Sequence, residues 1–254
     1  MIAVLAAVEI ELAGLRRRLR RCQRLSGERQ ATWLGYHGDQ TVLLCCTGVG
    51  RAEELAANLL DRHRPSLVLS VGSAGALAPG LDVGDVVICQ SVQSTRSGND
   101  AVRSDEWLLR LAVNCAKEAR LPLRHGHSLT VDRIIADPAE KEALHHSTGA
   151  DVVEMESYWI GRAAQEMGLP FFAVRTVLDG PRDQFPDTPN AVRPDGTLSR
   201  LRVLSYSLQH PGRLPSLFKL ASLHRRALPS LTHFLEAFVG AFQTLPLAEP
   251  ARRT

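Results

Sequence analysis

Residues 67–75 read Leu-Val-Leu-Ser-Val-Gly-Ser-Ala-Gly, an apolar run that ends in a glycine-rich segment. The run at 67–71 is short and apolar, which is typical of a strand buried on both faces of a sheet. Gly72, Ser73 and Gly75 follow it directly. In open α/β sheets, ligands bind at the carboxyl ends of the strands. The stretch therefore predicts a buried strand with a candidate binding segment at its end.

The same order of apolar run and polar segment recurs along the chain. Apolar runs at 2–7, 41–46 and 171–178 lead to Glu9 and Glu11, to Thr47-Gly48-Val49-Gly50 and to Asp179-Gly180-Pro181, respectively. Further strands are expected at 32–36, 83–91, 126–131 and 152–155, and helices at 9–20, 51–63, 105–119, 138–149 and 157–167. This alternation predicts an α/β fold in which helices cover both faces of a parallel or mixed sheet.

The composition changes after Asp179. The segment 181–197 holds four prolines and little periodicity, so we expect a loop or lid there. Helical spacing returns at 198–209 and 214–242, and Pro229 is expected to kink or divide the second helix. The expected organisation is a single domain over residues 1–245, which includes C-terminal helices at 198–243, followed by a disordered tail at 246–254.

Composition excludes several classes of protein. The chain has 254 residues and a formal net charge of +3, which is too small by itself to predict nucleic-acid binding. No apolar run is long enough to span a bilayer, and residues 1–7 lack the basic leader of a signal peptide, so we expect a cytoplasmic protein. The five cysteines show no metal-site spacing, which favours buried free thiols and no metal.

Acidic side chains stand near the ends of predicted strands. Glu154 and Glu156 lie beside hydrophobic neighbours, where a carboxylate is costly unless it has a partner or a role. Glu156 is equally well explained as an acid at a helix N-terminus, and Glu11 as an acid in a first helical turn. Asp179 can be read as a turn or cap residue. Taken together, the acids suggest a site that binds hydroxyls and moves protons.

Four segments, in this order, resemble the nucleoside phosphorylase and nucleosidase superfamily, and most of all its methylthioadenosine/S-adenosylhomocysteine nucleosidases. They are Ala7-Val8-Glu9-Ile10-Glu11, Val71-Gly72-Ser73-Ala74-Gly75, Val153-Glu154-Met155-Glu156-Ser157 and Val174-Arg175-Thr176-Val177-Leu178-Asp179. Gly72-Ser73-Ala74-Gly75-Ala76-Leu77, followed by Val83-Gly84-Asp85-Val86-Val87, is similar to the family's central signature. The resemblance covers residues 1–180 and implies a three-layer α/β/α fold with a mixed, twisted central sheet, plus C-terminal helices.

The resemblance also implies an activity, the cleavage of the bond between a purine and its ribose. Asp179 matches the acid that protonates the purine at N7, and Glu11 matches the carboxylate that activates water. Glu156 matches the residue that holds the ribose hydroxyls, and Met155 the residue that packs against the sugar. The other substrate-binding candidates are Ser73 and Gly72 on the acceptor side, Glu154, and Ile134 and Ile135 where the base stacks.

The acceptor is open between water and phosphate. Phosphorolytic relatives carry an arginine where this chain has Ser70, and Glu11 is present, so the residues favour water. Gly48-Val49-Gly50, with Arg51 at the start of the next helix, could instead donate N–H groups to an anion. A tight strand–helix turn explains these glycines equally well. We expect no cofactor, with phosphate as the alternative co-substrate.

A second resemblance concerns the substrate. Thr130-Val131-Asp132-Arg133, Arg193-Pro194-Asp195-Gly196 and the helices around His210-Pro211 and Leu214-Pro215 resemble hopanoid-associated phosphorylases. That branch implies adenosylhopane as the substrate and adenine as a product. The alternatives are a methylthioadenosine/S-adenosylhomocysteine nucleosidase and a non-catalytic nucleoside-binding or storage protein. Retention of Glu11, Glu156 and Asp179 argues against the storage protein. The family is usually dimeric, so we expect a homodimer.

The amphipathic C-terminal region has two interpretations. Leucines and phenylalanines alternate there with Lys219, Arg225 and Arg226. We favour helices that cover the sheet or a subunit interface. The alternative is a surface that contacts a membrane, which a lipid-tailed nucleoside would require. The expected partner is a small adenine nucleoside rather than nucleic acid.

Overall fold

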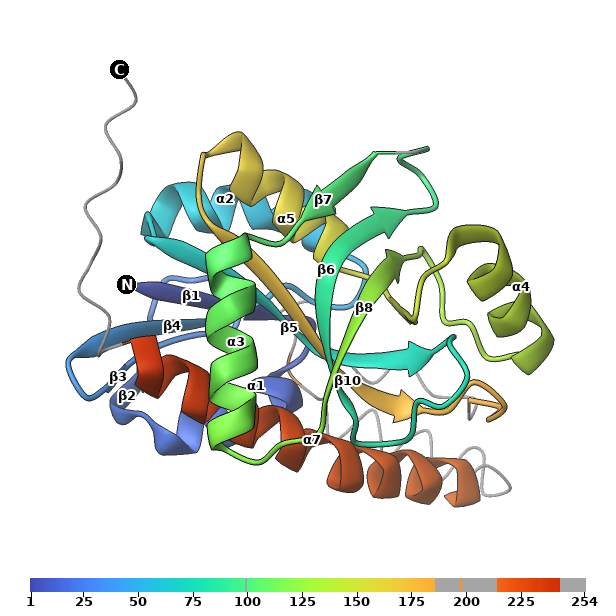
Figure 1. Ribbon diagram of the computed structural model, residues 1–254. Coiled ribbons are helices and arrows are strands. Elements are labelled where there is room, and N and C mark those ends of the chain that lie inside the picture. The colour runs from blue at the N-terminus through green and yellow to red at the C-terminus, as the bar shows by residue number, and fades with distance from the viewer. Residues whose placement is uncertain (99, 186–196, 198–213, 243–254) are drawn as a thin grey trace.

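The computed structural model describes residues 1–98, 100–185, 197 and 214–242. Within these ranges the chain forms a mixed sheet with helices on both faces (Figure 1). The strands are β1 (Ile2–Ala6), β2 (Arg20–Arg24), β3 (Thr32–His37), β4 (Gln40–Cys46), β5 (Leu67–Ala76), β6 (Val86–Ser94), β7 (Ala101–Arg103), β8 (Leu123–Thr130), β9 (Val152–Glu154) and β10 (Phe171–Asp179). The helices are α1 (Glu9–Arg18), α2 (Ala52–His63), α3 (Glu106–Glu118), α4 (Pro138–Thr148), α5 (Ser157–Glu166) and α7 (Leu214–Phe242).

The sheet is open at one end and closed on itself at the other. Strands β2, β3, β4, β1 and β5 lie side by side in that order, and β1 pairs in parallel with both β4 and β5. Beyond β5 the strands form a ring, because β5 pairs with both β9 and β10, while β6 and β8 join β10 to β9. Parallel and antiparallel pairs both occur, so the predicted α/β fold with a mixed sheet is confirmed.

Closure of the ring determines which strand ends meet. Gly75 near the end of β5 pairs with Asp179 of β10 on one side and with Val153 of β9 on the other. Residues that are far apart in sequence, and that follow three different strands, are therefore neighbours. No sequence pattern singled out these pairings, because strand periodicity does not specify the partner strand.

Two hydrophobic clusters hold the layers together. Ile2, Val4 and Ala6 of β1 face one cluster, whereas Ala3 and Leu5 face the other, so every residue of this strand is inside the protein. Helices α1, α3 and α7 pack on the first face, and α2 and α5 on the second. The short, wholly apolar run at the start of the chain is explained by this double coverage.

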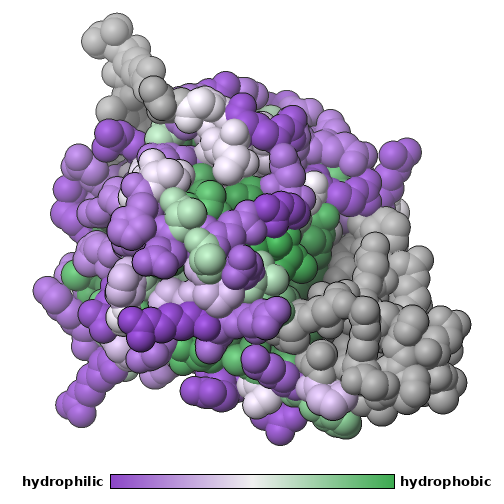
Figure 2. Space-filling view, turned by 90° about the vertical axis from the view of Figure 1, so that its right-hand side faces the viewer, coloured by the Kyte–Doolittle hydropathy of each residue, from purple (hydrophilic) through white to green (hydrophobic). Residues whose placement is uncertain are grey.

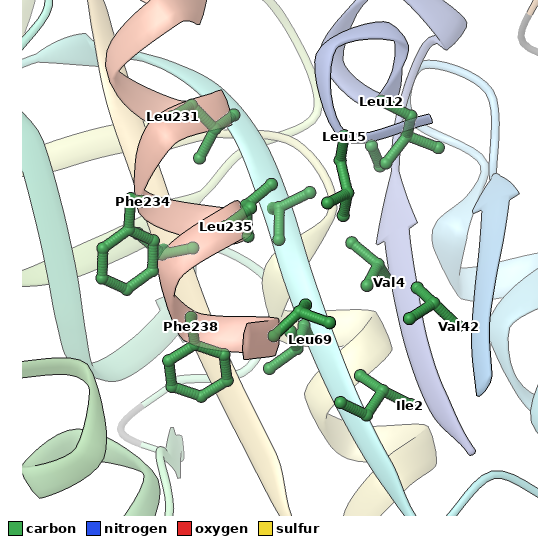
Figure 3. Packing of buried hydrophobic residues seen from close by; sticks show 14 of the residues in the cluster. Ile2, Val4, Leu12, Leu15, Val42, Leu69, Leu231, Phe234, Leu235 and Phe238 are labelled. Carbon is green, nitrogen blue, oxygen red and sulfur yellow. The ribbon is translucent and has the colours of Figure 1, made fainter. Parts of the chain in front are cut away.

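Helix α7 forms part of the first cluster through its second half. Leu235 lies on the side of the helix that faces β5 and β1, whereas the rings of Phe234 and Phe238 lie on the opposite side (Figure 3) and pack against Phe172 of β10. The ring of Phe238 stacks on Phe172 with 5.4 Å between centroids. The interpretation of the C-terminal region as a helix that covers the sheet is thus confirmed for this half. Pro229 lies inside α7 and does not divide it.

Some expectations lie outside the described residues. These are the helix at 198–209, most of the loop at 181–197 and the tail at 246–254. The division into one domain over 1–245 stays a prediction. None of the helices within the described ranges combines the length and the apolar character needed to cross a membrane.

Two strands, β2 and β7, were not predicted from the sequence. The helix predicted at 9–20 ends at Arg18, and β2 begins at Arg20. This strand lies at the edge of the sheet and is mostly exposed, so its charged residues give no apolar alternation. β7 has only three residues, which is too short for a periodic signal.

The cysteines are free as predicted, and burial raises the pKa of Cys45 and Cys89 to about 12.

The packing of α7 makes a prediction with an internal control. Phe238 is 0% exposed and Phe218, on the same helix, is 72% exposed. Phe238→Ala is expected to lower the free energy of unfolding by about 3–5 kcal/mol, because it removes buried apolar contacts and leaves a cavity. Phe218→Ala is expected to change it by less than about 0.5 kcal/mol. Urea unfolding followed by circular dichroism measures both, and equal losses would contradict the assigned packing.

Candidate active site

A large cavity lies where the ring strands end. It has a volume of about 1120 Å³ and is lined from β5, β9, β10, α1, α7 and the segment 131–135. Figure 2 views the molecule from the side on which β5 and β10 terminate in Figure 1, and shows apolar surface in a recess surrounded by hydrophilic residues. The position agrees with the expectation that ligands bind at the carboxyl ends of the strands.

Glu11, in the first turn of α1, is hydrogen-bonded to Ser73 of β5. Its Oε1 accepts hydrogen bonds from the backbone N–H and the hydroxyl of Ser73, both at 2.7 Å. Its Oε2 accepts a weaker bond from the N–H of Val8 at 3.3 Å. Gly72 permits this approach, because a Cβ at that position would lie 2.9 Å from Oε1. The carboxylate is therefore oriented at the wall of the cavity and almost fully buried.

Glu156 precedes α5 and is buried at the same cavity. Its Oε1 accepts a hydrogen bond from the backbone N–H of Gly50 at 2.9 Å. Burial, reinforced by the negative charge of Glu154, raises the pKa of Glu156 to about 8, and the charge of Glu11 acts in the same direction. This carboxyl therefore favours its protonated form at neutral pH far more than an ordinary glutamate does.

Glu154 is held by partners inside the protein. Its Oε2 accepts hydrogen bonds from Arg175 at 2.7 Å and from the backbone N–H groups of Glu156 at 3.0 Å and Ser157 at 2.7 Å. Its Oε1 accepts one from the hydroxyl of Thr130. Burial disfavours this carboxylate, but the charge of Arg175 and the hydrogen bonds outweigh it, so the pKa of Glu154 lies below its ordinary value.

Arg175 projects from the middle of β10 into the same buried network. Its Nη2 donates to the hydroxyls of Ser157 at 2.5 Å and Ser70 at 2.9 Å, in addition to Glu154. Ser70 is fully buried on β5 and is not among the residues that line the cavity. The ion pair therefore joins strands β5, β9 and β10 to the start of α5 behind the wall of the cavity.

Asp179 ends β10 and lines the cavity. Its Oδ2 forms an ion pair with the ammonium of Lys141, a fully buried residue on α4. Burial raises the pKa of Asp179 above its ordinary value, although the hydrogen bond and charge of Lys141 oppose the shift. A buried carboxyl with a raised pKa and a nearby cation is a typical proton-transfer group.

The remaining part of the cavity is apolar near one end and mixed at the other. Ile134 and Ile135 lie on its wall beside Met155. The cavity then extends between α1 and α7, where its lining residues include Gly14, Arg17, Arg18, Leu220, Ala221, His224, Arg225, Leu228, Thr232 and His233. Its volume of about 1120 Å³ lies slightly above the ~300–1,000 Å³ range of small-molecule pockets. It can therefore hold more than a compact ligand.

The structure brings the sequence-predicted site residues together. Those that line this one cavity are Glu11, Ser73, Ile134, Ile135, Glu154, Met155, Glu156 and Asp179, and Gly72 lies against Glu11. Their roles stay predictions. The sequence interpretation did not assign a site role to Arg175, Thr130 or Lys141. A charged residue inside an apolar strand could have indicated Arg175. Lys141 stands between two glutamates on a helix and resembles an ordinary surface lysine.

Comparisons with known proteins agree with this fold. A family model described as the phosphorylase superfamily matches residues 1–193. The 5′-methylthioadenosine/S-adenosylhomocysteine nucleosidase of Staphylococcus carnosus is 26% identical over 198 residues, which cover 70% of this chain and 86% of that protein. The corresponding Staphylococcus aureus protein is 25% identical over 196 residues, with the same coverage.

Solved structures show the same architecture. The 5′-methylthioadenosine/S-adenosylhomocysteine nucleosidase of Neisseria meningitidis, in complex with methylthio-immucillin-A, has a TM-score of 0.75 at 19% identity and covers 94% of this chain and 98% of its own. A mutant of the futalosine hydrolase of Helicobacter pylori has a TM-score of 0.73 at 16% identity, with the same coverage. These similarities establish the fold, which places the cavity at the ends of the ring strands.

The raised pKa of Glu156 predicts a pH dependence of stability. The folded protein binds this proton more tightly than the unfolded chain, so the stabilisation is complete below the ordinary pKa and is lost as pH rises toward about 8. Glu156→Gln has no proton to lose. Its free energy of unfolding relative to wild type should therefore increase by about 1–3 kcal/mol between about pH 5 and about pH 8.

Urea unfolding at several pH values measures this difference. Glu118→Gln is the matched control, because Glu118 is exposed on α3, and it should follow the wild-type curve. Parallel curves for wild type and Glu156→Gln would contradict the assigned protonation of Glu156.

Proposed function

The chain belongs to the phosphorylase superfamily, and from this membership we propose that it is an enzyme that cleaves the N-ribosidic bond of a purine nucleoside. The observation that carries the proposal is the convergence of Glu11, Glu156 and Asp179 on one cavity from three separate elements. The relatives named above are nucleosidases and a futalosine hydrolase, which supports N-glycosyl hydrolysis as the reaction class.

Asp179 is proposed as the general acid. A purine leaves ribose poorly as an anion, so a proton delivered to N7 makes it a better leaving group. The raised pKa of Asp179 increases the fraction of protonated acid available near neutral pH. The side chain stands next to Gly75, whose lack of a Cβ leaves room beside the carboxyl oxygens.

Glu156 is proposed to bind the ribose hydroxyls, with Met155 packed against the sugar. When the glycosidic bond breaks, positive charge develops on the sugar ring, and a carboxylate beside it stabilises that charge. Glu156 is buried and its Oε1 is already oriented by the N–H of Gly50. Hydroxyl groups that donate to Glu156 favour its ionised form, so substrate binding would lower the pKa that burial raises.

Glu11 is proposed as the base that activates water, with Ser73 and Gly72 forming the acceptor side. The hydroxyl and the N–H of Ser73 both donate to Glu11, which orients the carboxylate at the cavity wall. Ser70, which occupies the position of the phosphate-binding arginine of phosphorolytic relatives, carries no charge and is engaged in the buried network. These residues favour water over phosphate as the acceptor.

Ile134 and Ile135 are proposed to contact the base, giving an aliphatic stack.

Glu154 is proposed to act through its neighbour Glu156, because both oxygens of Glu154 already have protein partners. By accepting the N–H of Glu156 and pairing with Arg175, it holds the start of α5 in place. Its charge also raises the pKa of Glu156.

An adenosine with a bulky 5′ substituent, such as adenosylhopane, is the proposed substrate, and adenine the released base. Two observations support it. The cavity extends beyond the acids between α1 and α7, and it is larger than a compact nucleoside requires. Leu220, Ala221 and Leu228 supply apolar surface in this extension. A methylthioadenosine/S-adenosylhomocysteine nucleosidase is the second candidate, because the curated relatives carry that name.

A further alternative is a nucleoside-binding or storage protein without catalysis. It would bind nucleosides and release no base. The presence of a buried acid with a raised pKa favours the enzyme, because binding alone does not need one.

Three further expectations are also proposals. They are contact with a membrane surface, assembly as a homodimer and a cytoplasmic location. The first half of α7 exposes Phe218, Lys219, Arg225 and Arg226 close to the cavity extension. Apolar and cationic side chains on one exposed helix are typical of a surface that binds anionic lipid.

The activity is tested through its proposed acid. Wild-type protein is expected to release adenine from adenosine derivatives without added phosphate, with the correspondingly 5′-substituted ribose as the other product. Asp179→Asn cannot give a proton and should lower the rate by about 10²–10⁴-fold while the fold is kept. Chromatography of adenine measures the rate, and circular dichroism checks the fold. A fully active Asp179→Asn would contradict the mechanism, and nucleoside binding without release would favour the storage protein.

The size of the 5′ substituent is tested with adenosines of increasing apolar 5′ chains, carried in vesicles of anionic lipid where they are insoluble. Long chains are expected to raise kcat/KM over methylthioadenosine by about tenfold or more, because each buried methylene adds binding energy. Wild-type protein should also sediment with the vesicles, and Phe218→Ala less so. Preference for methylthioadenosine would identify the second candidate instead.

A further inference from the structure

Lys141 is a buried cation behind the site that has no part in the mechanism above. It lies on α4, its side chain is fully buried, and it is not among the residues that line the cavity. Its ammonium donates to Oδ2 of Asp179, to the carbonyl of Gly180 at 2.9 Å and to the carbonyl of Asp183 at 2.8 Å. The three ammonium hydrogens thus have three acceptors, all at the end of β10 and in the turn that follows it.

A buried ammonium is costly unless it is paired and fully hydrogen-bonded. Here the charged partner is the one carboxylate that faces the cavity from β10. Lys141 occupies only Oδ2. The other oxygen, Oδ1, accepts no hydrogen bond from the described part of the chain, and it lies 3.4 Å from the place that a Cβ on Gly75 would take. One carboxyl oxygen is therefore held, and the other is left for a ligand.

We propose that Lys141 is a positioning residue for Asp179: its ammonium holds the carboxyl group by Oδ2, leaves Oδ1 for the base, and stabilises the carboxylate that remains after proton transfer. This inference rests on the proposed function. It concerns a residue on a different helix, 38 positions away in sequence, that does not touch the substrate.

The proton balance shows what the cation does. The bond between C1′ of the ribose and N9 breaks, its electron pair moves onto the purine, and the proton on Oδ1 moves to N7. Water adds to C1′ and gives a proton to Glu11. Glu11 then releases this proton to solvent and Asp179 takes one up, which restores both groups. The negative charge that Asp179 acquires during the step lies against the ammonium of Lys141. The ammonium stabilises this charge, which an apolar wall would not do.

Three charged groups act on Asp179 from the elements around it. They are Lys141 on α4, Asp183 in the turn and Lys219 on α7. Burial raises the pKa of Asp179, Lys141 is the main influence that lowers it, Asp183 raises it and Lys219 lowers it. Removing the charge of Lys141 should therefore raise the pKa further, so that the protonated acid persists to higher pH.

The experiment is adenine release as a function of pH by wild type, Lys141→Met, Lys141→Gln and Lys141→Arg. In the two neutral variants, kcat at neutral pH should fall at least about tenfold, because the acid is misplaced. The alkaline limb of the pH profile, where kcat/KM falls as the acid loses its proton, should move to higher pH by about one unit or more. Lys141→Arg keeps the charge and should keep the limb of the wild type. Lys117→Met, at an exposed lysine of α3, is the matched control and should change neither.

The position of the limb separates this proposal from a merely structural role. Glu156 also titrates near pH 8, but Lys141 is not among the groups that shift it, so a movement of the limb reports Asp179. A lower kcat with an unmoved limb in the neutral variants overturns the proposal, as does wild-type behaviour.

Folding of each variant is checked by circular dichroism. If neither neutral variant folds, Lys141→Arg decides: a lower kcat with the wild-type limb supports the proposal, and a shifted limb overturns it. If wild type releases no base from any nucleoside, the proposed function itself has failed and this inference fails with it.

Discussion

The buried ion pair between Arg175 and Glu154 determines the shape of the site. It joins β10 to β9, and through the hydroxyls of Ser70 and Ser157 it reaches β5 and the start of α5. Removing either charge would leave the other uncompensated in the interior, which is far more costly than the pair itself. The closed part of the sheet and the orientation of α5 therefore depend on the same contact. Because Glu156 begins that helix, its position follows from the pair.

The same pair gives neighbouring carboxyl groups different protonation states. Glu154 is kept ionised by Arg175, and its charge then raises the pKa of Glu156 to about 8. Asp179 is buried at the end of β10, where burial raises its pKa against the opposing influence of Lys141. Carboxyl groups whose environments separate their pKa values can serve as acid, as charge stabiliser and as structural anion within one site.

The size of the cavity follows from how α7 is attached. The second half of the helix is fixed in the core by Phe234 and Phe238. The first half packs against the end of β10 through Leu223 and Ala227, and with α1 it lines part of the cavity through residues such as Leu220 and Leu228. A single helix thus contributes both to the hydrophobic core and to the part of the cavity that would accept a 5′ substituent. This division connects the stability of the fold with the proposed choice of substrate.

Periodicity in the sequence by itself determined most of the strands and helices and a parallel or mixed α/β sheet, because it records which faces of an element are buried. The roles of Glu11, Glu156 and Asp179 were predicted only through the resemblance to nucleosidases. Periodicity did not indicate the edge strand β2, whose charged residues are solvated on the rim. Closure of the ring and the partners of Arg175 and Lys141 were decided only by the tertiary structure. Register brings Asp179 beside Gly75, and helix packing places an ammonium against a carboxyl group 38 residues away, contacts that no local pattern encodes.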